Sequence, residues 1–350
     1  CIAKLSKAGI SMGNVCITID GGTTNTRCLI WDQEARVIAS CKCNIGARNG
    51  AMEHGNDTLK VQLKHNLEQV LTSSGHSWRD VEYILACGMI TCSSGLYELP
   101  HLSTPAGLKE LSEGIQTILL PEVSPVPIHF IPGVKNHVNH LDFESIDQMD
   151  MMRGEETESM ALLRLHHTGS PMLLILPGSH NKYISVDEQS RITGCMTSMS
   201  GEILSSLTQN TILAASVNCS FLDESELDRH WLLNGYKNSC ELGIGRAAFL
   251  TRVLHLFCEL SPQQLGSYLL GTVLALDLEA LRGSKAIIFN HGFKIVIGGR
   301  GTMALALSQV LEEEYPNSEV LLDRTEYLAG MGARLIWQTM NTRKYIQKTS

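Results

Sequence analysis

Apolar positions recur along the chain with two different spacings. In the run 56–71 they stand three or four residues apart, which places them on one face of a helix. Elsewhere, short runs of apolar and β-branched residues have the length of buried strands. The helical spacing also predicts helices over 154–165, 202–215, 224–259, 261–281, 302–313 and 327–339. Strands are predicted over 15–20, 27–32, 81–86, 172–176, 182–187, 294–297 and 320–322. Because strands and helices follow one another throughout, the pattern predicts an α/β protein.

Two of the predicted strand pairs share one pattern. In 15–32 and again in 172–187, an apolar strand enters a turn of small residues and a second strand leaves it. Aligning Gly22 on Gly178 gives an offset of 156 residues (178 − 22), close to the usual size of a domain. The sequence therefore predicts two copies of one fold, with domains over 14–165 and 166–340.

Composition excludes several classes of partner. The chain has 350 residues, of which 43% are hydrophobic, and a formal net charge of −8. That apolar content is sufficient for two buried cores. The acidic balance argues against binding to nucleic acid or to an anionic membrane. A homo-oligomer remains compatible with this composition.

The cysteines and the N-terminal residues indicate a reducing compartment. Most of the eleven cysteines lie in apolar segments, as Cys16, Cys87 and Cys258 do, where a thiol behaves as a small buried hydrophobe. Residues 1–13 lack the apolar stretch of a signal peptide, and no apolar run has the length of a membrane span. We therefore expect a cytoplasmic protein.

The first candidate site is the turn that follows Asp20. Glycines such as Gly22 allow close approach of the main chain to a phosphate, and successive N–H groups there form an anion-binding nest. The hydroxyls of Thr23 and Thr24 add donors. Asp20, at the end of a strand, can hold a water bound to Mg²⁺. An ordinary hairpin turn is the alternative interpretation, but the acid and the following Arg27 favour a phosphate site.

Two further glycine turns are candidates for phosphate or nucleotide binding. One is the turn at Gly178 and Ser179, followed by His180 and Lys182, whose N–H groups and ammonium can bind phosphate. The other runs from Gly298 to Gly301 between a strand and a helix, where a nucleotide can lie along the main chain. Neither the dinucleotide fingerprint nor a P-loop occurs in the chain.

Adjacent carboxylates mark the predicted helix start at 154. Arg153 and Gly154 precede Glu155 and Glu156. Acidic residues in the first turn complement the helix dipole, and that role alone can account for one of them. The alternative is a general base beside a cationic anchor. The sequence leaves both open.

Together these motifs resemble a known family. The segments that carry the resemblance are Asp20–Arg27, Gly88–Gly95, Ile131–Gly133, Met152–Thr157, Leu176–Lys182 and Met199–Glu202. Their order and residue types are similar to the 2-dehydro-3-deoxygalactonokinase family of the actin-like and sugar kinase ATPase superfamily. The chain departs from the family pattern at Gly21 and Tyr183, where the family usually has Trp, and at Ser200, where it has Thr.

The resemblance implies two ribonuclease H-like domains around a nucleotide cleft, with ATP and Mg²⁺ as cofactors. It also implies phosphorylation of the terminal hydroxyl of a 2-keto-3-deoxy sugar acid, taking 2-dehydro-3-deoxy-galactonate to its 6-phosphate. Two alternative functions are compatible with the same motifs. One is a phosphoanhydride hydrolase of the exopolyphosphatase type, and the other is a nucleotide-binding relative without catalysis.

The resemblance also implies roles for the residues singled out above. Asp20 positions Mg²⁺, and the two small-residue turns bind phosphate. The turn at Gly298, Gly299 and Gly301 borders the adenosine. By analogy with exopolyphosphatases, Glu156, or else Glu155, takes the proton of the hydroxyl.

The carboxylate of a sugar acid needs a cationic partner. Arg27 and Arg153 are the candidates, because a guanidinium binds a carboxylate through two parallel hydrogen bonds. Asn25 and Ser93 are expected to hydrogen-bond the hydroxyls of the sugar acid.

Overall fold

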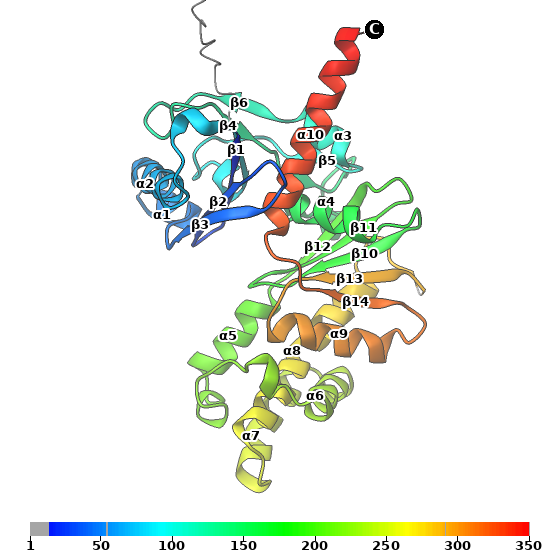
Figure 1. Cartoon of the computed structure of the whole chain (residues 1–350). Coiled ribbons are helices and arrows are strands. Elements are labelled where there is room, and N and C mark those ends of the chain that lie inside the picture. The colour runs from blue at the N-terminus through cyan, green and yellow to red at the C-terminus, as the bar shows by residue number, and fades with distance from the viewer. Residues whose placement is uncertain (1–13, 54, 291, 350) are drawn as a thin grey trace, which may run out of the picture. The chain divides into compact units, whose positions relative to one another are not determined.

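The chain folds into two compact units, each built on a β-sheet (Figure 1). The computed structural model describes residues 14–53, 55–290 and 292–349. Residues 1–13, where the sequence predicts no signal peptide, lie outside the described residues. Unit 1 contains the chain up to 102, residues 108–133 and the chain from 329 on; unit 2 contains 103–107 and 134–328. Each unit is described by itself.

Unit 1 is built on a six-stranded sheet in the order β3-β2-β1-β4-β7-β6. Its strands are β1 (Val15–Gly21), β2 (Thr26–Trp31), β3 (Val37–Cys43), β4 (Val81–Gly88), β6 (Gln116–Ile118) and β7 (Ile128–Phe130). The first three form an antiparallel meander. β4 pairs parallel to β1 and β7 parallel to β4, whereas β6 is an antiparallel edge strand. The predicted strands 15–20, 27–32 and 81–86 are confirmed.

Helices cover both faces of this sheet. On one face α2 (Asp57–Ser73) buries Leu59, Leu63 and Leu67, which belong to the same apolar cluster as Ile17 and Ile19. The other face is covered by α10 (Leu328–Thr349), where the guanidinium carbon of Arg334 lies 5.0 Å from the centre of the Trp31 ring. A Cβ added to Gly330 would lie 2.7 Å from that ring. The helix can therefore lie flat on the sheet only with glycine at this position.

Unit 2 repeats the arrangement in a five-stranded sheet, ordered β12-β11-β10-β13-β14. Its strands are β10 (Met172–Leu176), β11 (Asn181–Val186), β12 (Ile192–Ser198), β13 (Lys294–Gly298) and β14 (Val320–Asp323). β10, β11 and β12 are antiparallel, and β13 and β14 continue the sheet in parallel. Every residue of β10 is buried, as expected for a strand covered on both faces.

The helices of unit 2 pack on this sheet and on one another. They are α4 (Glu155–His166), α5 (Ser200–Asn210), α6 (Arg229–Leu242), α7 (Ile244–Phe257), α8 (Pro262–Gly283) and α9 (Thr302–Glu314). The predicted helix over 261–281 is confirmed as α8, which Ser261 caps, with its hydroxyl accepting from the N–H of Gln264 at 3.3 Å. The helical stretch predicted over 224–259 contains two helices, α6 and α7. It is broken at Gly243, whose φ of 76° lies outside the helical region.

The two sheets share one connectivity. Each has an antiparallel meander in the order 3-2-1, continued by two parallel strands. This is the ribonuclease H-like order, and it confirms the prediction of two such domains from the actin-like ATPase group.

The compact units do not coincide with a boundary at 165. The segment from 134 belongs to unit 2 because it bonds to that unit's sheet. The side-chain amide of Asn136, for example, donates to the carbonyl of Cys195 at 2.8 Å. The last helix belongs to unit 1 because it covers Trp31.

Ten cysteines fall within the described residues, and all are free thiols. Cys16 and Cys87 are buried as expected, but Cys258 is exposed because it follows the last turn of α7. Among the described residues, no helix combines the length and the apolar character that crossing a membrane requires.

Candidate functional site

In unit 1, the predicted motifs meet at one edge of the sheet. Asp20 stands at the end of β1, Gly88 at the end of β4, and the Ile131–Gly133 segment directly after β7. These three strands are parallel, so their carboxyl ends lie at the same edge. Ligands of open α/β sheets bind at that edge.

The β1–β2 turn is closed by main-chain bonds. The N–H of Gly22 donates to the carbonyl of Asn25 at 2.7 Å. Thr23 and Thr24 are exposed at its tip. Gly46, which follows β3, packs against the turn so closely that a Cβ there would lie 2.4 Å from the carbonyl oxygen of Gly22. The turn therefore has a rigid support that only glycine can provide.

Asp20 is half-buried beside this turn. Gly88 packs closely against this strand end, because a Cβ at Gly88 would lie 2.4 Å from the carbonyl oxygen of Gly21 and 3.5 Å from Oδ1 of Asp20. No three acidic, His or Cys side chains gather into a metal cluster anywhere in the described part of the chain. Magnesium bound with nucleotides commonly uses one or two carboxylates and the phosphates themselves, and Asp20 fits that pattern.

The predicted sugar-acid residues of unit 1 belong to the segments that follow β1 and β4. Arg27 is the cross-strand partner of Asp20 on β2, and its other neighbour across the sheet is Lys42. Both cationic side chains belong to exposed residues. Ser93 is exposed in the turn after the short helix Met89–Thr91 that follows β4. The side-chain amide of Asn25 donates to the hydroxyl of Thr24 at 3.0 Å.

The β10–β11 turn in unit 2 is the counterpart of the first turn. The N–H of Gly178 donates to Oδ1 of Asn181 at 3.0 Å. Gly201 supports the turn as Gly46 does in unit 1, and a Cβ there would lie 2.3 Å from the carbonyl oxygen of Gly178. The two supporting glycines are 155 residues apart (201 − 46). The internal repeat therefore includes the two turns and also the segment that follows the third strand of each sheet.

His180 and Lys182 have partners of their own. Nε2 of His180 lies 3.2 Å from the carboxylate of Glu202, and both side chains are about half exposed. Lys182 is buried, and its ammonium donates to the carbonyl of Met151 at 2.6 Å and to the hydroxyl of Thr197. The predicted phosphate contact of Lys182 is therefore corrected. Its place on β11 opposite Thr197 directs it into the unit rather than toward the turn.

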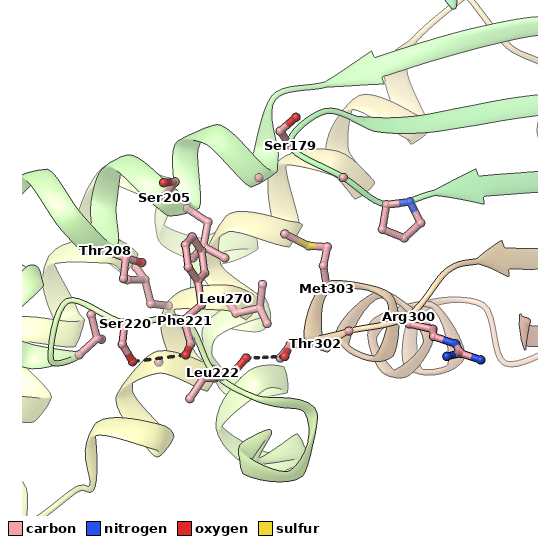
Figure 2. A pocket seen from close by; sticks show the side chains of 18 residues that line it. Ser179, Ser205, Thr208, Ser220, Phe221, Leu222, Leu270, Arg300, Thr302 and Met303 are labelled. Atoms are coloured by element: carbon pink, nitrogen blue, oxygen red, sulfur yellow. Dashed lines mark hydrogen bonds between the residues drawn. The ribbon is translucent and has the colours of Figure 1, made fainter. Parts of the chain in front are cut away.

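A pocket of about 470 Å³ opens beside the β10–β11 turn (Figure 2). Gly178, Ser179 and Gly201 form its rim at the turn. Its other lining residues are Pro177, which directly follows β10, and residues of α5, α8, the 217–222 segment, and the turn and first residues of α9. They are Pro177, Leu204, Ser205, Thr208, Val217, Ser220, Phe221, Leu222, Gly266, Leu269, Leu270, Arg300, Gly301, Thr302 and Met303. The size and the apolar lining with a few hydroxyls are typical of small-molecule sites.

The glycine turn before α9 is only partly in this pocket. Gly301 lines it, whereas Gly298 and Gly299 do not. Gly299 is held away by its N–H, which donates to the carbonyl of Asp323 at 2.9 Å. The N–H of Gly301 donates to the carboxylate of Glu224, a contact that sequence reasoning missed. The start of α9 thus already has an anionic partner within the chain.

Glu155 and Glu156 differ in their surroundings at the start of α4. Glu156 is fully buried, and both of its carboxylate oxygens accept the N–H of Gly154, at 2.8 and 2.9 Å. Burial, with Glu155 as a second cause, raises the pKa of Glu156 to about 8. Glu155 is half-buried and accepts the N–H of Arg153 at 3.0 Å. One carboxylate is therefore accessible and the other is enclosed.

Comparison with known proteins identifies the family of the chain. The sequence model of the 2-keto-3-deoxy-galactonokinase family matches residues 20–333. The chain belongs to this family. A curated relative from Rhizobium meliloti (strain 1021), named "Probable 2-dehydro-3-deoxygalactonokinase DgoK1", is 26% identical over 199 residues. That match spans 57% of this chain and 58% of the relative's length.

A solved structure has the same fold. It is a protein from Sinorhizobium meliloti described as a "putative 2-dehydro-3-deoxygalactonokinase protein". It superimposes with a TM-score of 0.71 and 21% identity, over 94% of this chain and 99% of that one. The membership of the kinase family and the shared fold confirm the resemblance read from the motifs.

Sequence reasoning missed a buried acid beneath the second turn. Asp277 of α8 is fully buried, within the apolar run from Val273 to Leu278. A charged residue in the apolar stretch of a helix is almost never fully buried without partners. That rule was the signal available in the sequence, and it would have marked Asp277 as part of a polar network.

Proposed function

We propose that this protein is an ATP-dependent kinase that phosphorylates the terminal hydroxyl of a 2-keto-3-deoxy sugar acid. The substrate proposed is 2-dehydro-3-deoxy-galactonate and the product its 6-phosphate. The observation that carries the proposal is the family match over residues 20–333. The glycine-turn geometry in both units gives it independent chemical support.

The nucleotide is proposed to bind to unit 2. Its adenosine fits the apolar pocket lined by Phe221 and Met303, and Arg300 and Gly301 border it. Its phosphates fit the adjoining turn, where main-chain N–H groups and the hydroxyl of Ser179 supply donors. His180 directly follows Ser179 and is exposed, and its ring N–H is proposed as a further donor to the phosphates.

Mg²⁺ and the phosphate-facing turn of unit 1 are the second part of the proposal. Asp20 would hold Mg²⁺, directly or through a bound water, and Gly22, Thr23 and Thr24 would donate to phosphate oxygens. Magnesium supplies charge neutralisation for the transferred phosphoryl group. The half-buried position of Asp20 at the carboxyl end of β1 supports this assignment.

Phosphoryl transfer also needs an acceptor for the hydroxyl proton. The terminal oxygen of the sugar acid attacks the γ-phosphorus, the bond to ADP breaks, and the proton passes to a carboxylate. A base must contact the hydroxyl, and Glu156 has no exposed surface. We therefore propose the accessible Glu155 as the base, which reverses the order of preference drawn from the sequence. Glu156 closes the turn before α4.

The substrate carboxylate is proposed to bind Arg27, with Arg153 as the second candidate. Arg27 is exposed, and no ion pair joins it to an acidic side chain of the described residues. Its guanidinium is thus available to an incoming anion. Asn25 and Ser93 remain the proposed partners of the sugar hydroxyls.

The cytoplasm is the proposed compartment of the protein. The free thiols of the described cysteines support a reducing environment.

An ADP-coupled assay with galactonate-derived and gluconate-derived 2-keto-3-deoxy acids side by side tests the proposal. ADP release that depends on the acid and yields a phosphorylated acid is expected. Phosphate release without an acceptor would instead support the hydrolase. ATP binding without turnover on either acid would support the non-catalytic relative.

A pair of variants tests the nucleotide pocket. Ser205 lines the pocket, whereas its neighbour Ser206 is exposed on the same helix. The substitution Ser205→Trp is expected to fill the pocket and abolish ATP binding measured by calorimetry. Ser206→Trp should bind ATP as the wild type does. Equal binding by both variants would contradict the proposed pocket.

A further inference from the structure

Asp277 is a fully buried carboxylate whose oxygens all have donors. Oδ2 accepts from Nδ2 of Asn181 and from the hydroxyl of Tyr183, each at 2.8 Å. Oδ1 accepts from the hydroxyls of Ser198 and Ser200. An ionised carboxylate has about four lone-pair sites. Four donors therefore satisfy its charged form without water.

This carboxylate determines how the β10–β11 turn closes. Because Nδ2 of Asn181 donates to Asp277, the amide is oriented with Oδ1 toward the turn, where it accepts the N–H of Gly178. Ser200 opens α5 one residue before Gly201, which supports the same turn. One buried acid thus orders both segments that form the rim of the pocket in Figure 2.

The equivalent turn of unit 1 closes in another way. Gly22 also has an asparagine three residues later, but its N–H donates to the main-chain carbonyl of Asn25 rather than to a side chain. That closure does not depend on any side chain. The turn of unit 2 depends on Asn181 and therefore on whatever orients Asn181.

We propose that Asp277 is a positioning residue for the nucleotide phosphates. It holds Asn181 so that the Gly178–Ser179 turn keeps the shape in which its N–H groups can donate to a phosphate, and it does not itself contact the ligand. In metal sites, mutation of the residues that orient the ligands typically lowers affinity by about 10- to 100-fold, and we expect an effect of the same order at this turn. The inference rests on the proposed function, because it assumes that this turn binds the phosphates of ATP.

The variants Asp277→Asn and Asn181→Ala test it by calorimetry with a non-hydrolysable ATP analogue and by steady-state kinetics. Asp277→Asn keeps the shape but replaces one acceptor oxygen with a donor. Loss of a hydrogen bond to a charged group is expected to raise the dissociation constant and the KM for ATP by about 10- to 100-fold. The KM for the sugar acid should stay within about twofold of the wild type, whereas a general loss of structure would not produce this split.

Tyr183→Phe is the matched control. It removes one donor to the same oxygen of Asp277 but leaves Asn181 and the turn in place. It should lower the melting temperature and leave the affinity for the ATP analogue unchanged. If Asp277→Asn does not fold, Asn181→Ala decides, because it leaves three donors on Asp277.

The two failures are distinguishable. Wild-type protein that binds no ATP analogue would overturn the proposed function and this inference with it. If the wild type binds the analogue and Asn181→Ala binds it with an affinity within about twofold of the wild type, the positioning role alone is overturned. The same holds for Asp277→Asn if that variant folds.

Discussion

The main-chain N–H of Gly154 lies between the two carboxylate oxygens of Glu156, 2.8 Å from one and 2.9 Å from the other. The side chain is completely buried. The main-chain N–H groups of Glu156 itself and of Gly154 lower the pKa of this carboxyl, but burial has the larger effect, so the pKa is raised to about 8. The acid is consequently protonated at neutral pH in the folded protein and ionised in the unfolded chain.

We predict that stability falls between pH 5 and pH 8 because of Glu156. Its folded pKa lies above its ordinary value of 4.5, so the folded state binds the extra proton and loses this advantage as the pH rises through 8. The full effect is on the order of 5 kcal/mol at 1.36 kcal/mol per pH unit. Denaturant unfolding of wild type and Glu156→Gln at several pH values measures it. If the free energy of unfolding changes with pH equally in both proteins, Glu156 does not have the raised pKa assigned to it.

Substitution of the two neighbouring glutamates should affect turnover unequally. Glu155→Gln is expected to lower kcat by about 10²- to 10⁴-fold, the usual contribution of a positioned base. Glu156→Gln keeps an oxygen for the N–H of Gly154 and should retain most of kcat. Single-turnover kinetics at saturating ATP and sugar acid make the comparison. The reverse order of effects would restore Glu156 as the base.

Adding one methyl group at Gly201 should weaken nucleotide binding. Its Cβ would lie 2.3 Å from the carbonyl oxygen of Gly178, so the turn must shift. We expect Gly201→Ala to raise the KM for ATP by about tenfold and to cost about 1–3 kcal/mol of stability. Gly245→Ala is the control, because no atom lies within 4 Å of a Cβ at this exposed helical position. It should be neutral in kinetics and slightly stabilising.

Removal of the Asp20 carboxylate should change the requirement for magnesium. Asp20→Asn is expected to raise the Mg²⁺ concentration for half-maximal activity by about 10- to 100-fold. Titration of activity with MgCl₂ after treatment with EDTA measures this. Asp32→Asn serves as the control, since Asp32 lies beyond the other end of β2 and pairs with Arg36 at 2.7 Å. An unchanged magnesium curve for Asp20→Asn would remove the proposed metal role.

Much of the architecture could be predicted because it depends on local pattern. Apolar spacing located α2 and α4 to within a few residues, and the helix predicted over 261–281 begins within one residue of α8. The offset between Gly22 and Gly178 revealed the duplicated sheet. The glycine turns were found in the same way, because main-chain segments that approach each other closely require glycine, which is visible in the sequence.

What could not be predicted depends on contacts between distant segments. Nothing local to α10 indicates that it covers Trp31 rather than the sheet of unit 2. The burial of Lys182 follows from its cross-strand neighbour Thr197, which only the register reveals. The relative exposure of Glu155 and Glu156 likewise depends on how α4 is packed, since the two residues have identical side chains.

The placement of α10 has a consequence for the order in which the two units fold. Unit 2 is nearly continuous in sequence and ends at 328, whereas unit 1 begins the chain and is completed only by the helix from 328 to 349. During translation, domains fold as units once their residues have emerged from the ribosome. The second unit can therefore finish folding first, and the first must wait, with the Trp31 face of its sheet uncovered, until the last helix has been synthesised.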